Sequence, residues 1–350
     1  MLPESQVAVV AVGFLLDAAP VACAGGATLR RSAAGRPAVP GSVRYVETVI
    51  VGARGSRLAQ VMVQELINHL SGCPVVKFKA RSVMTEGDKD RKTLVRNLGG
   101  GAGGVFTTQL EQELLAGRVD IAVHSLKDLP TAPTDGLVLA VTPLRADPLD
   151  ALCGATLESL RPGARVGTGS ARRIAQLKAL RPDVEVVPIR GNVPGRLART
   201  KSGLDAVLLA AAGLRRLGQD DAITELLDPE LFPPSPGQGA LAVQVRSGDR
   251  ELLEMLNAFG DPDADATVRA ERAVLGELHG GCSVPVGAYA TRSGGVLSLS
   301  AQVTSMDGRE RVTGTVTGTT PETTGMELAA LLRDRGADAI LNQIREPASR

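Results

Sequence analysis

The sequence predicts an α/β protein with two α/β domains followed by a smaller C-terminal α+β domain. Short apolar strands alternate with amphipathic helices between residues 48 and 142, and the alternation resumes near residue 147. From about residue 262 the order becomes one helix, three strands and a second helix. Strand–helix alternation favours parallel or mixed sheets covered on both faces, whereas strands grouped between helices indicate a small α+β unit.

The first α/β block begins with a buried strand at Thr48–Gly52. An amphipathic helix follows, because Leu58, Met62, Leu66 and Leu70 recur every four residues. The remaining elements of this block are a strand at Val75–Val83, a helix at 107–116, and strands at Val119–Val123 and Leu137–Thr142.

The second block contains strands at Arg165–Gly167, Val184–Ile189 and Ala206–Leu209, with helices starting near Ser170 and Gly195. Phe232–Gly239 holds three prolines and two glycines, which predicts a loop or a crossover. A further strand at Leu241–Val245 is expected to return to the first sheet.

The third block starts with a helix at 263–278, which places Ala270, Val274 and Leu278 on one face. Strands at 284–292, 296–304 and 310–318 and a helix at 324–335 complete it. We therefore predict an N-terminal extension at 1–45, a first domain at 46–143 and 240–258, a second domain at 147–234 and a third domain at 262–350.

The first 45 residues differ from the rest of the chain. Val7–Leu16 is apolar, but Glu4 precedes it, no Lys or Arg does, and Asp17 ends it. A secretory signal normally has a basic start, so a signal peptide is the lesser alternative to a poorly ordered extension or an upstream translation start. No apolar run reaches 18 residues, so we expect no transmembrane helix and no membrane partner.

Composition excludes several functional classes. Lys+Arg is 39 and Asp+Glu is 38, a balance that argues against a broadly basic nucleic-acid-binding protein. Aromatic residues make up 2%, which argues against stacking platforms for single-stranded nucleic acid. The four cysteines form no C-x-x-C pair and there are three histidines, so we expect no metal site and a reducing, cytoplasmic location.

Arginine outnumbers lysine by 32 to 7, and three strand-to-helix turns carry Arg together with Ser, Thr or Asn: Arg54–Ala59, Gly167–Arg172 and Arg190–Arg196. Such turns meet at the carboxyl ends of strands, where α/β proteins bind ligands. Guanidinium groups grip carboxylates or phosphates in bidentate fashion, so together the turns predict a site for a small polyanion. For each turn alone, a capped helix with solvated arginines is the alternative.

The segment His124–Pro130 ends an apolar strand with an imidazole, an ammonium and a carboxylate. Asp128, beside Lys127, is a candidate general acid/base or a stabiliser of a developing cation. The alternatives are an ordinary turn residue before Pro130 for Asp128, and a buried histidine for His124.

Cys282 lies in the glycine-rich segment Gly280–Pro285, directly after a predicted helix. An accessible thiol there is a candidate nucleophile, and a buried, inert cysteine is the alternative.

Taken in order, these motifs resemble the hydroxymethylbilane synthase family, also called porphobilinogen deaminase. The resemblance covers about residues 48–345 and rests on Val123–Pro130, Val166–Arg173, Arg190–Asn192, Ala212–Gly218, Pro236–Ala240 and Gly280–Pro285.

The resemblance implies the head-to-tail condensation of four porphobilinogen molecules with release of ammonia at each step. Hydrolysis then frees the linear tetrapyrrole hydroxymethylbilane. It also implies a dipyrromethane cofactor held covalently by Cys282, two periplasmic-binding-protein-like α/β domains, a third domain that carries the cysteine, and a monomer. Each pyrrole ring bears an acetate and a propionate, so the growing chain is a polyanion that suits the arginine-bearing turns.

Residue by residue, Asp128 matches the catalytic aspartate of the family. The positions implied to hold the cofactor, besides Cys282, are Asp88, Ser125, Lys127, Thr168, Ser170, Arg172, Arg173 and Gln238. Those implied to hold substrate are Arg54, Ser56, Phe106, Arg190, Asn192, Arg196 and Arg216.

One segment departs from the family pattern. Asn97–Phe106 is about two residues longer, and Gly103 stands where the family often has a lysine. Whether Arg96 replaces that lysine stays open. We expect this glycine-rich stretch to be a mobile loop that acts as a lid.

Two other functions compete with this interpretation. A non-catalytic two-lobed binding module for a small polycarboxylate would share the Arg-bearing turns but would not need Cys282. A nucleotide-dependent enzyme is disfavoured, because no G-x-x-x-x-G-K-[ST] is present and Arg172 replaces the third glycine of a dinucleotide fingerprint.

Overall fold

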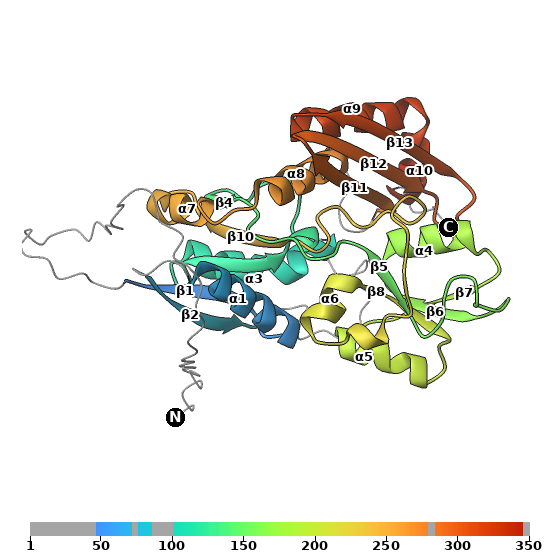
Figure 1. Ribbon diagram of the computed structural model, residues 1–350, viewed down its shortest axis with the longest axis horizontal. Coiled ribbons are helices and arrows are strands. Elements are labelled where there is room, and N and C mark those ends of the chain that lie inside the picture. Colours follow the sequence, from blue (N-terminus) through green and yellow to red (C-terminus); the bar gives the residue numbers. More distant parts are fainter. Residues whose placement is uncertain (1–46, 72–75, 86–100, 279–283, 346–350) are drawn as a thin grey trace, which may run out of the picture.

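A computed structural model describes residues 47–71, 76–85, 101–278 and 284–345, with the backbone alone described at 101–106 (Figure 1). The described chain forms three sheets, two of five strands and one of three strands. The predicted α/β class with a C-terminal α+β unit is confirmed. The division of the chain into domains at the residues given above remains our proposal.

The first sheet has the strand order β2-β1-β3-β10-β4. Its strands β1, β2 and β3 run parallel, while β10 is antiparallel to both β3 and β4. The strand at Leu241 does return to this sheet, where Leu241 lies opposite Ser125. The elements are β1 (Glu47–Arg54), α1 (Arg57–Leu70), β2 (Val76–Val83), α3 (Gly101–Leu115), β3 (Ile121–Ser125), β4 (Leu137–Leu139), β10 (Leu241–Arg246) and α7 (Arg250–Asn257).

The second sheet repeats this plan with the order β7-β6-β8-β5-β9. Strands β6, β7 and β8 are parallel, and β5 is antiparallel to β8 and β9. The elements are β5 (Asp150–Cys153), β6 (Arg165–Thr168), α4 (Ala171–Leu180), β7 (Glu185–Pro188), α5 (Val193–Leu197), β8 (Ala206–Ala210), α6 (Ala211–Arg216) and β9 (Glu225–Leu226).

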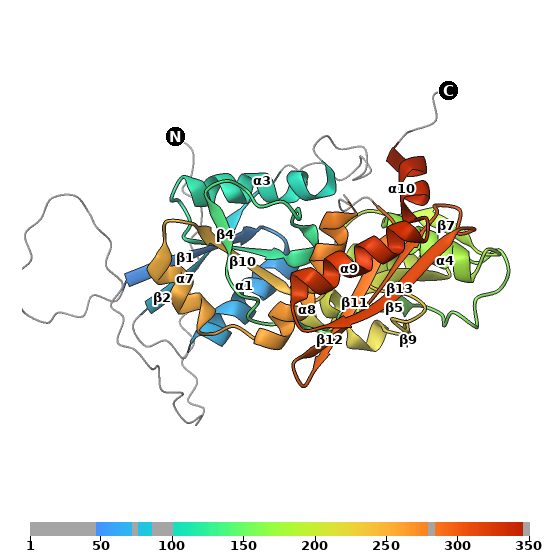
Figure 2. The same cartoon turned by 90° about the horizontal axis from the view of Figure 1, so that it is seen from above.

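The third sheet is the antiparallel meander β11-β12-β13, and α8 and α9 pack on each other and on its strands (Figure 2). Helix α8 begins where Asp261 caps it, since its carboxylate accepts from the backbone N–H groups of Asp263 and Ala264. The elements are α8 (Pro262–Glu277), β11 (Val286–Ser293), β12 (Val296–Thr304), β13 (Arg311–Gly318), α9 (Pro321–Asp334) and α10 (Ala337–Arg345).

The two α/β sheets lie side by side in Figure 1, with α8 between the first sheet and the C-terminal sheet. A buried ion pair, Arg145 to Glu271 at 2.8 Å, joins α8 to the segment that leaves the first sheet. None of the described helices is both long and apolar enough to cross a lipid bilayer.

Some predicted boundaries were wrong. The strand expected at Leu137–Thr142 ends at Leu139, because the Val141 and Thr142 N–H groups donate to side chains of Asn257 and Asp265. Residues 101–106, expected in a loop, form the first turns of α3. Extending an existing helix costs less free energy than nucleating one, so the strong helix after residue 107 continues into glycines. The strands β5 and β9 and the helices α6, α7 and α10 were not predicted.

Candidate active site

Strand β3 delivers the segment that carries Lys127 and Asp128. A short 3-10 turn, Leu126–Asp128, follows the strand. Leu126 and Leu129 are buried in a small apolar cluster, whereas Lys127 and Asp128 between them are only half-buried. The two leucines therefore fix the turn to the apolar cluster, while the charged side chains of Lys127 and Asp128 lie on the other side of the turn.

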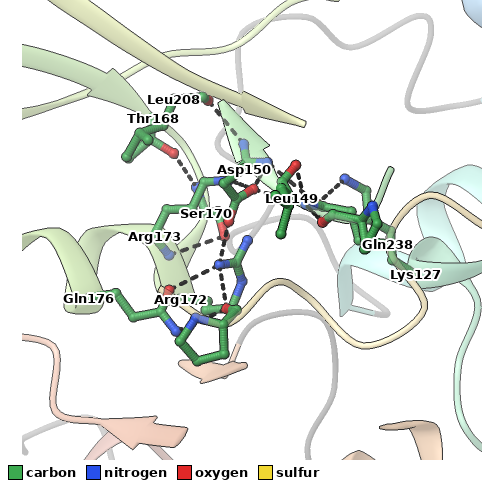
Figure 3. A network of polar contacts seen from close by, with 12 residues as sticks. Lys127, Leu149, Asp150, Thr168, Ser170, Arg172, Arg173, Gln176, Leu208 and Gln238 are labelled. Atoms are coloured by element: carbon green, nitrogen blue, oxygen red, sulfur yellow. Dashed lines mark hydrogen bonds and ion pairs between the residues drawn. The ribbon is translucent and has the colours of Figure 1, made fainter. Parts of the chain in front are cut away.

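Asp150, the first residue of β5, has a buried carboxylate that pairs with two arginines of α4 (Figure 3). Arg173 approaches one carboxylate oxygen to 2.6 Å, and Arg172 approaches the other to 2.7 Å. Burial alone would raise the pKa of Asp150, but the two guanidinium charges outweigh it and hold that pKa well below its usual range. Asp150 is therefore ionised at neutral pH.

Arg172 and Arg173, whose turn was predicted to help bind a small polyanion, are not free cations, because both pair with Asp150. Only 3% of Arg172 and 5% of Arg173 is exposed. Arg173 also donates to the Leu208 carbonyl, and Arg172 to Gln176 and to the Pro233 carbonyl. A buried charge needs a partner, and Asp150 supplies it. Sequence reasoning missed Asp150, whose only signal was a carboxylate at the head of an apolar run.

Gln238 links this cluster to Lys127. Its amide nitrogen donates to Asp150 at 2.9 Å, and its amide oxygen accepts from Lys127 Nζ at 2.9 Å (Figure 3). Gly237 and Gly239 flank it with φ of 73° and 88°, a backbone conformation that glycine adopts without strain. Burial, and next the nearby Arg173 charge, lower the pKa of Lys127 to about 8.

Arg190 and Arg196 lie in and after the turn that follows β7. Together with Lys127, Arg172 and Arg173 they form what we call the basic region. Burial lowers the pKa of Arg196 to about 10, the charges of Arg173 and Arg190 act in the same direction, and Asp128 opposes them. These residues are thus close enough to interact electrostatically. Arg190 Nη1 and Arg172 Nε are shielded from solvent and have no hydrogen-bond acceptor among the described residues.

Three predicted site residues cap helices with their side chains. The backbone N–H groups of Ala59, Arg173 and Gly195 donate to Ser56, Ser170 and Asn192 at 3.2, 3.5 and 2.9 Å. Thr168, almost fully buried, accepts from the Ser170 backbone N–H at 3.3 Å. The capped-helix alternative therefore accounts for these side chains.

The other predicted residues have separate partners. Arg216 pairs with Glu65 of α1 at 2.7 Å and also donates to the Gly239 carbonyl. The Ser125 hydroxyl donates to Met62 Sδ at 3.7 Å. His124 is 5% exposed, as the buried-histidine alternative predicts. Burial lowers its pKa to about 4, and the nearby charge of Arg54 acts in the same direction.

Family models match most of the chain. The model described as "Porphobilinogen deaminase, dipyromethane cofactor binding domain" matches residues 49–254, and "Porphobilinogen deaminase, C-terminal domain" matches residues 266–334. A curated porphobilinogen deaminase from Geobacillus kaustophilus is 41% identical over 308 residues, which cover 86% of this chain and 99% of that protein. One from Roseiflexus castenholzii is 44% identical over 302 residues, covering 84% and 98%.

The chain belongs to the porphobilinogen deaminase family. The Asp150 cluster, Lys127, Asp128, Gln238 and the turn after β7 all lie in the part that matches the cofactor-binding model of this family. The segment that contains Cys282 lies in the part that matches its C-terminal model.

Solved structures give a weaker likeness. An ancestral cationic amino acid solute-binding protein aligns with a TM-score of 0.39 at 16% identity, over 61% of this chain and 87% of that one. The Bordetella pertussis BvgS periplasmic VFT2 domain aligns with a TM-score of 0.38 at 16% identity, over 61% and 86%. TM-scores below 0.5 do not by themselves establish a shared fold.

Several residues to which the family resemblance assigns a role lie outside the described part of the chain. Cys282, Asp88 and Arg96 lie there, and of Phe106 only the backbone, in α3, is described. The predicted extension at 1–45 and residues 97–100 of the predicted lid at 97–106 lie there too, while residues 101–106 of that segment are in α3. Within the described residues, Cys153 is buried, and burial raises its pKa to about 11. No group of three or more His, Cys, Asp or Glu side chains in that part of the chain is arranged so that it could hold a metal ion.

Proposed function

We propose that this chain is a hydroxymethylbilane synthase. It joins four porphobilinogen molecules head to tail, releases one ammonia per step and frees hydroxymethylbilane by hydrolysis. The observation that carries the proposal is identity of 41–44% to proteins named porphobilinogen deaminase, over nearly their whole length. This match favours catalysis over the alternative of a non-catalytic binding module.

The residues of the basic region fit a polycarboxylate cofactor. Arg172 Nε and Arg190 Nη1 are shielded donors without acceptors among the described residues, and ligand carboxylates would supply the missing acceptors. Dipyrromethane, attached to Cys282, would be held by Lys127 and Arg172, with Arg173, Ser170, Thr168 and Gln238 holding these groups in place. When bound, it supplies the pyrrole carbon to which the first substrate is joined.

Asp128 is the proposed catalytic group. Departure of ammonia leaves positive charge on the substrate pyrrole, and a carboxylate next to the ring stabilises that charge. As a new carbon–carbon bond forms, the pyrrole carbon that reacts loses one proton, and Asp128 or a water molecule accepts it. Lys127 is the neighbour of Asp128 in this turn, and the charges of the two side chains interact.

The predicted substrate residues are proposed to hold substrate carboxylates or rings: Arg54, Ser56, Phe106, Arg190, Asn192, Arg196 and Arg216. Arg216 already has a carboxylate partner in Glu65, so a substrate group would have to displace or share it. We also propose a cytoplasmic monomer whose small-molecule substrate is porphobilinogen.

Intact mass spectrometry of the purified chain, combined with a porphobilinogen consumption assay, tests this function. We expect an added mass equal to one dipyrromethane, located on Cys282 by peptide mapping, and consumption of porphobilinogen. Cofactor-free protein incubated with porphobilinogen should gain the same mass. A chain that stays at its bare mass after that incubation and consumes no porphobilinogen would refute the proposal.

A further inference from the structure

Arg272, on α8, holds the backbone of the segment that carries Asp128. Its guanidinium donates to the Pro130 carbonyl at 2.6 Å, the Leu129 carbonyl at 3.1 Å and the Leu126 carbonyl at 3.4 Å. These acceptors stand on both sides of Asp128 in the sequence. A planar guanidinium presents its donors in a fixed fork, so one side chain restrains both ends of the short turn.

Arg272 links α8 to the turn that carries Asp128 in a part of the molecule where side-chain packing is incomplete. One turn earlier on α8, Val268 packs against Leu126 and Leu129. Cavities of about 300 and 270 Å³ are both lined by Arg272. Side-chain atoms do not fill the space beside Arg272, so its hydrogen bonds are direct links between α8 and the turn.

The adjacent residue of α8 holds a second part of the site. The Glu271 carboxylate accepts from the Gly237 backbone N–H at 2.8 Å, directly before Gln238, whose amide oxygen binds Lys127. Helix α8 therefore fixes the Lys127–Asp128 turn through Arg272 and the partner of Lys127 through Glu271. Cys282 follows in the sequence, five residues after Glu277, the last residue of α8.

We infer that Arg272 is a positioning residue: it sets the place of the Asp128 carboxylate relative to the helix that leads to Cys282. The inference rests on the proposed function, in which a group attached to Cys282 must meet Asp128. Because the reaction extends a tethered chain, an error in this relation reduces the rate of the chemical step more than it weakens substrate binding.

The test uses Arg272→Ala and Arg272→Lys in the full chain carrying its cofactor, with kcat expressed per cofactor-loaded, folded molecule. For both variants we expect kcat to fall roughly tenfold to hundredfold with KM within about twofold of the original chain, as for a misplaced catalytic group. Lysine keeps the charge but lacks the fork, so it should not restore the rate. If Arg272→Ala does not fold, Arg272→Lys decides alone.

Arg269→Ala is the matched control. Arg269 lies one turn away on α8, is half exposed and pairs with Asp265 and Glu322. It should leave kcat within about twofold, as exposed pairs contribute little. An unchanged kcat per folded molecule in both Arg272 variants, with only a lower thermal midpoint, would show a purely structural role and overturn the inference. If the original chain consumes no porphobilinogen, the proposed function itself fails.

Discussion

Asp128 is half-buried at the end of a turn whose neighbours Leu126 and Leu129 supply the apolar anchoring. Its carboxylate is therefore available for chemistry and contributes little to packing. We expect Asp128→Asn to reduce porphobilinogen turnover by roughly 10²- to 10⁴-fold, the range of general acid/base contributions. Circular dichroism should show an unchanged fold, and turnover within a factor of ten of the original chain would remove Asp128 from the proposed role.

Asp150 is the counter-charge of two buried guanidiniums. Asp150→Asn leaves both without a carboxylate, which we expect to lower the free energy of unfolding by about 3–5 kcal/mol in urea titrations. Asp263→Asn is the control, because Asp263 is largely exposed and pairs with Arg292 at the surface, where a pair contributes about 1 kcal/mol or less. Equal losses in the two variants would contradict this account of Asp150.

Because His124 is buried, the free energy of unfolding depends on pH through its protonation. Its pKa is about 4 in the folded chain and 6.5 is its ordinary value, so the unfolded chain binds more protons between these values. The stabilisation from neutral His124 is complete above pH 6.5 and is lost as the pH falls toward 4, by up to about 3 kcal/mol. Urea unfolding at pH 7 and pH 4.5 should show a smaller difference for His124→Gln than for the original chain. An identical difference would refute the assignment.

At the scale of elements, helix starts follow local chemistry. Ser56, Ser170, Asn192 and Asp261 each cap a helix through a side-chain oxygen. A serine, asparagine or aspartate at such a position satisfies N–H groups that the helix itself leaves unpaired. The start of α4 was predicted near Ser170, and that of α5, predicted near Gly195, lies two residues earlier at Val193.

Helix α8 offers a clean test of capping, because Asp261 lies outside the candidate site. We expect Asp261→Ala to lower the free energy of unfolding by about 0.5–2 kcal/mol and Asp261→Ser to recover most of the loss, since serine also caps. Chemical denaturation of the three proteins measures this. If serine destabilised as much as alanine, the carboxylate charge near the helix start, rather than its hydrogen bonds, would be the stabilising feature.

At the scale of the whole molecule, α1 of the first sheet and α6 of the second are joined by Glu65 and Arg216. In the proposed function, Arg216 meets a substrate carboxylate, for which Glu65 is a competitor. We expect Glu65→Gln to lower the KM for porphobilinogen by about two- to fivefold, a gain in keeping with a partly exposed ion pair. Steady-state kinetics measures this change.

Arg215 provides the control on the same helix. It pairs with Asp220 at 3.5 Å near the surface, so Asp220→Asn removes a similar charge without touching Arg216. We expect no change in KM for that variant. A higher KM in Glu65→Gln would mean that Glu65 holds Arg216 in the position that substrate requires, rather than competing for it.

The sequence by itself determined the elements with a strong local signal. Apolar spacing predicted α1, and three strands were predicted in the third block, where the third sheet lies. A strand after the proline- and glycine-rich crossover was expected to return to the first sheet, and it does. Five elements were missed, among them the four-residue strand β5, because short apolar runs suit strands, turns and buried helices alike. The motif order also indicated the family that the comparisons show.

Only the tertiary structure decided which charges neutralise one another. Arg173 meets Asp150 from 23 positions away, Arg272 meets Leu129 from 143 and Arg216 meets Glu65 from 151. Hydrogen bonds and Coulomb forces depend on separation in space, and no local pattern in the chain encodes that separation. The sequence therefore indicated which arginines lie in turns that could bind a ligand, and the tertiary structure decided which of them stay available to one.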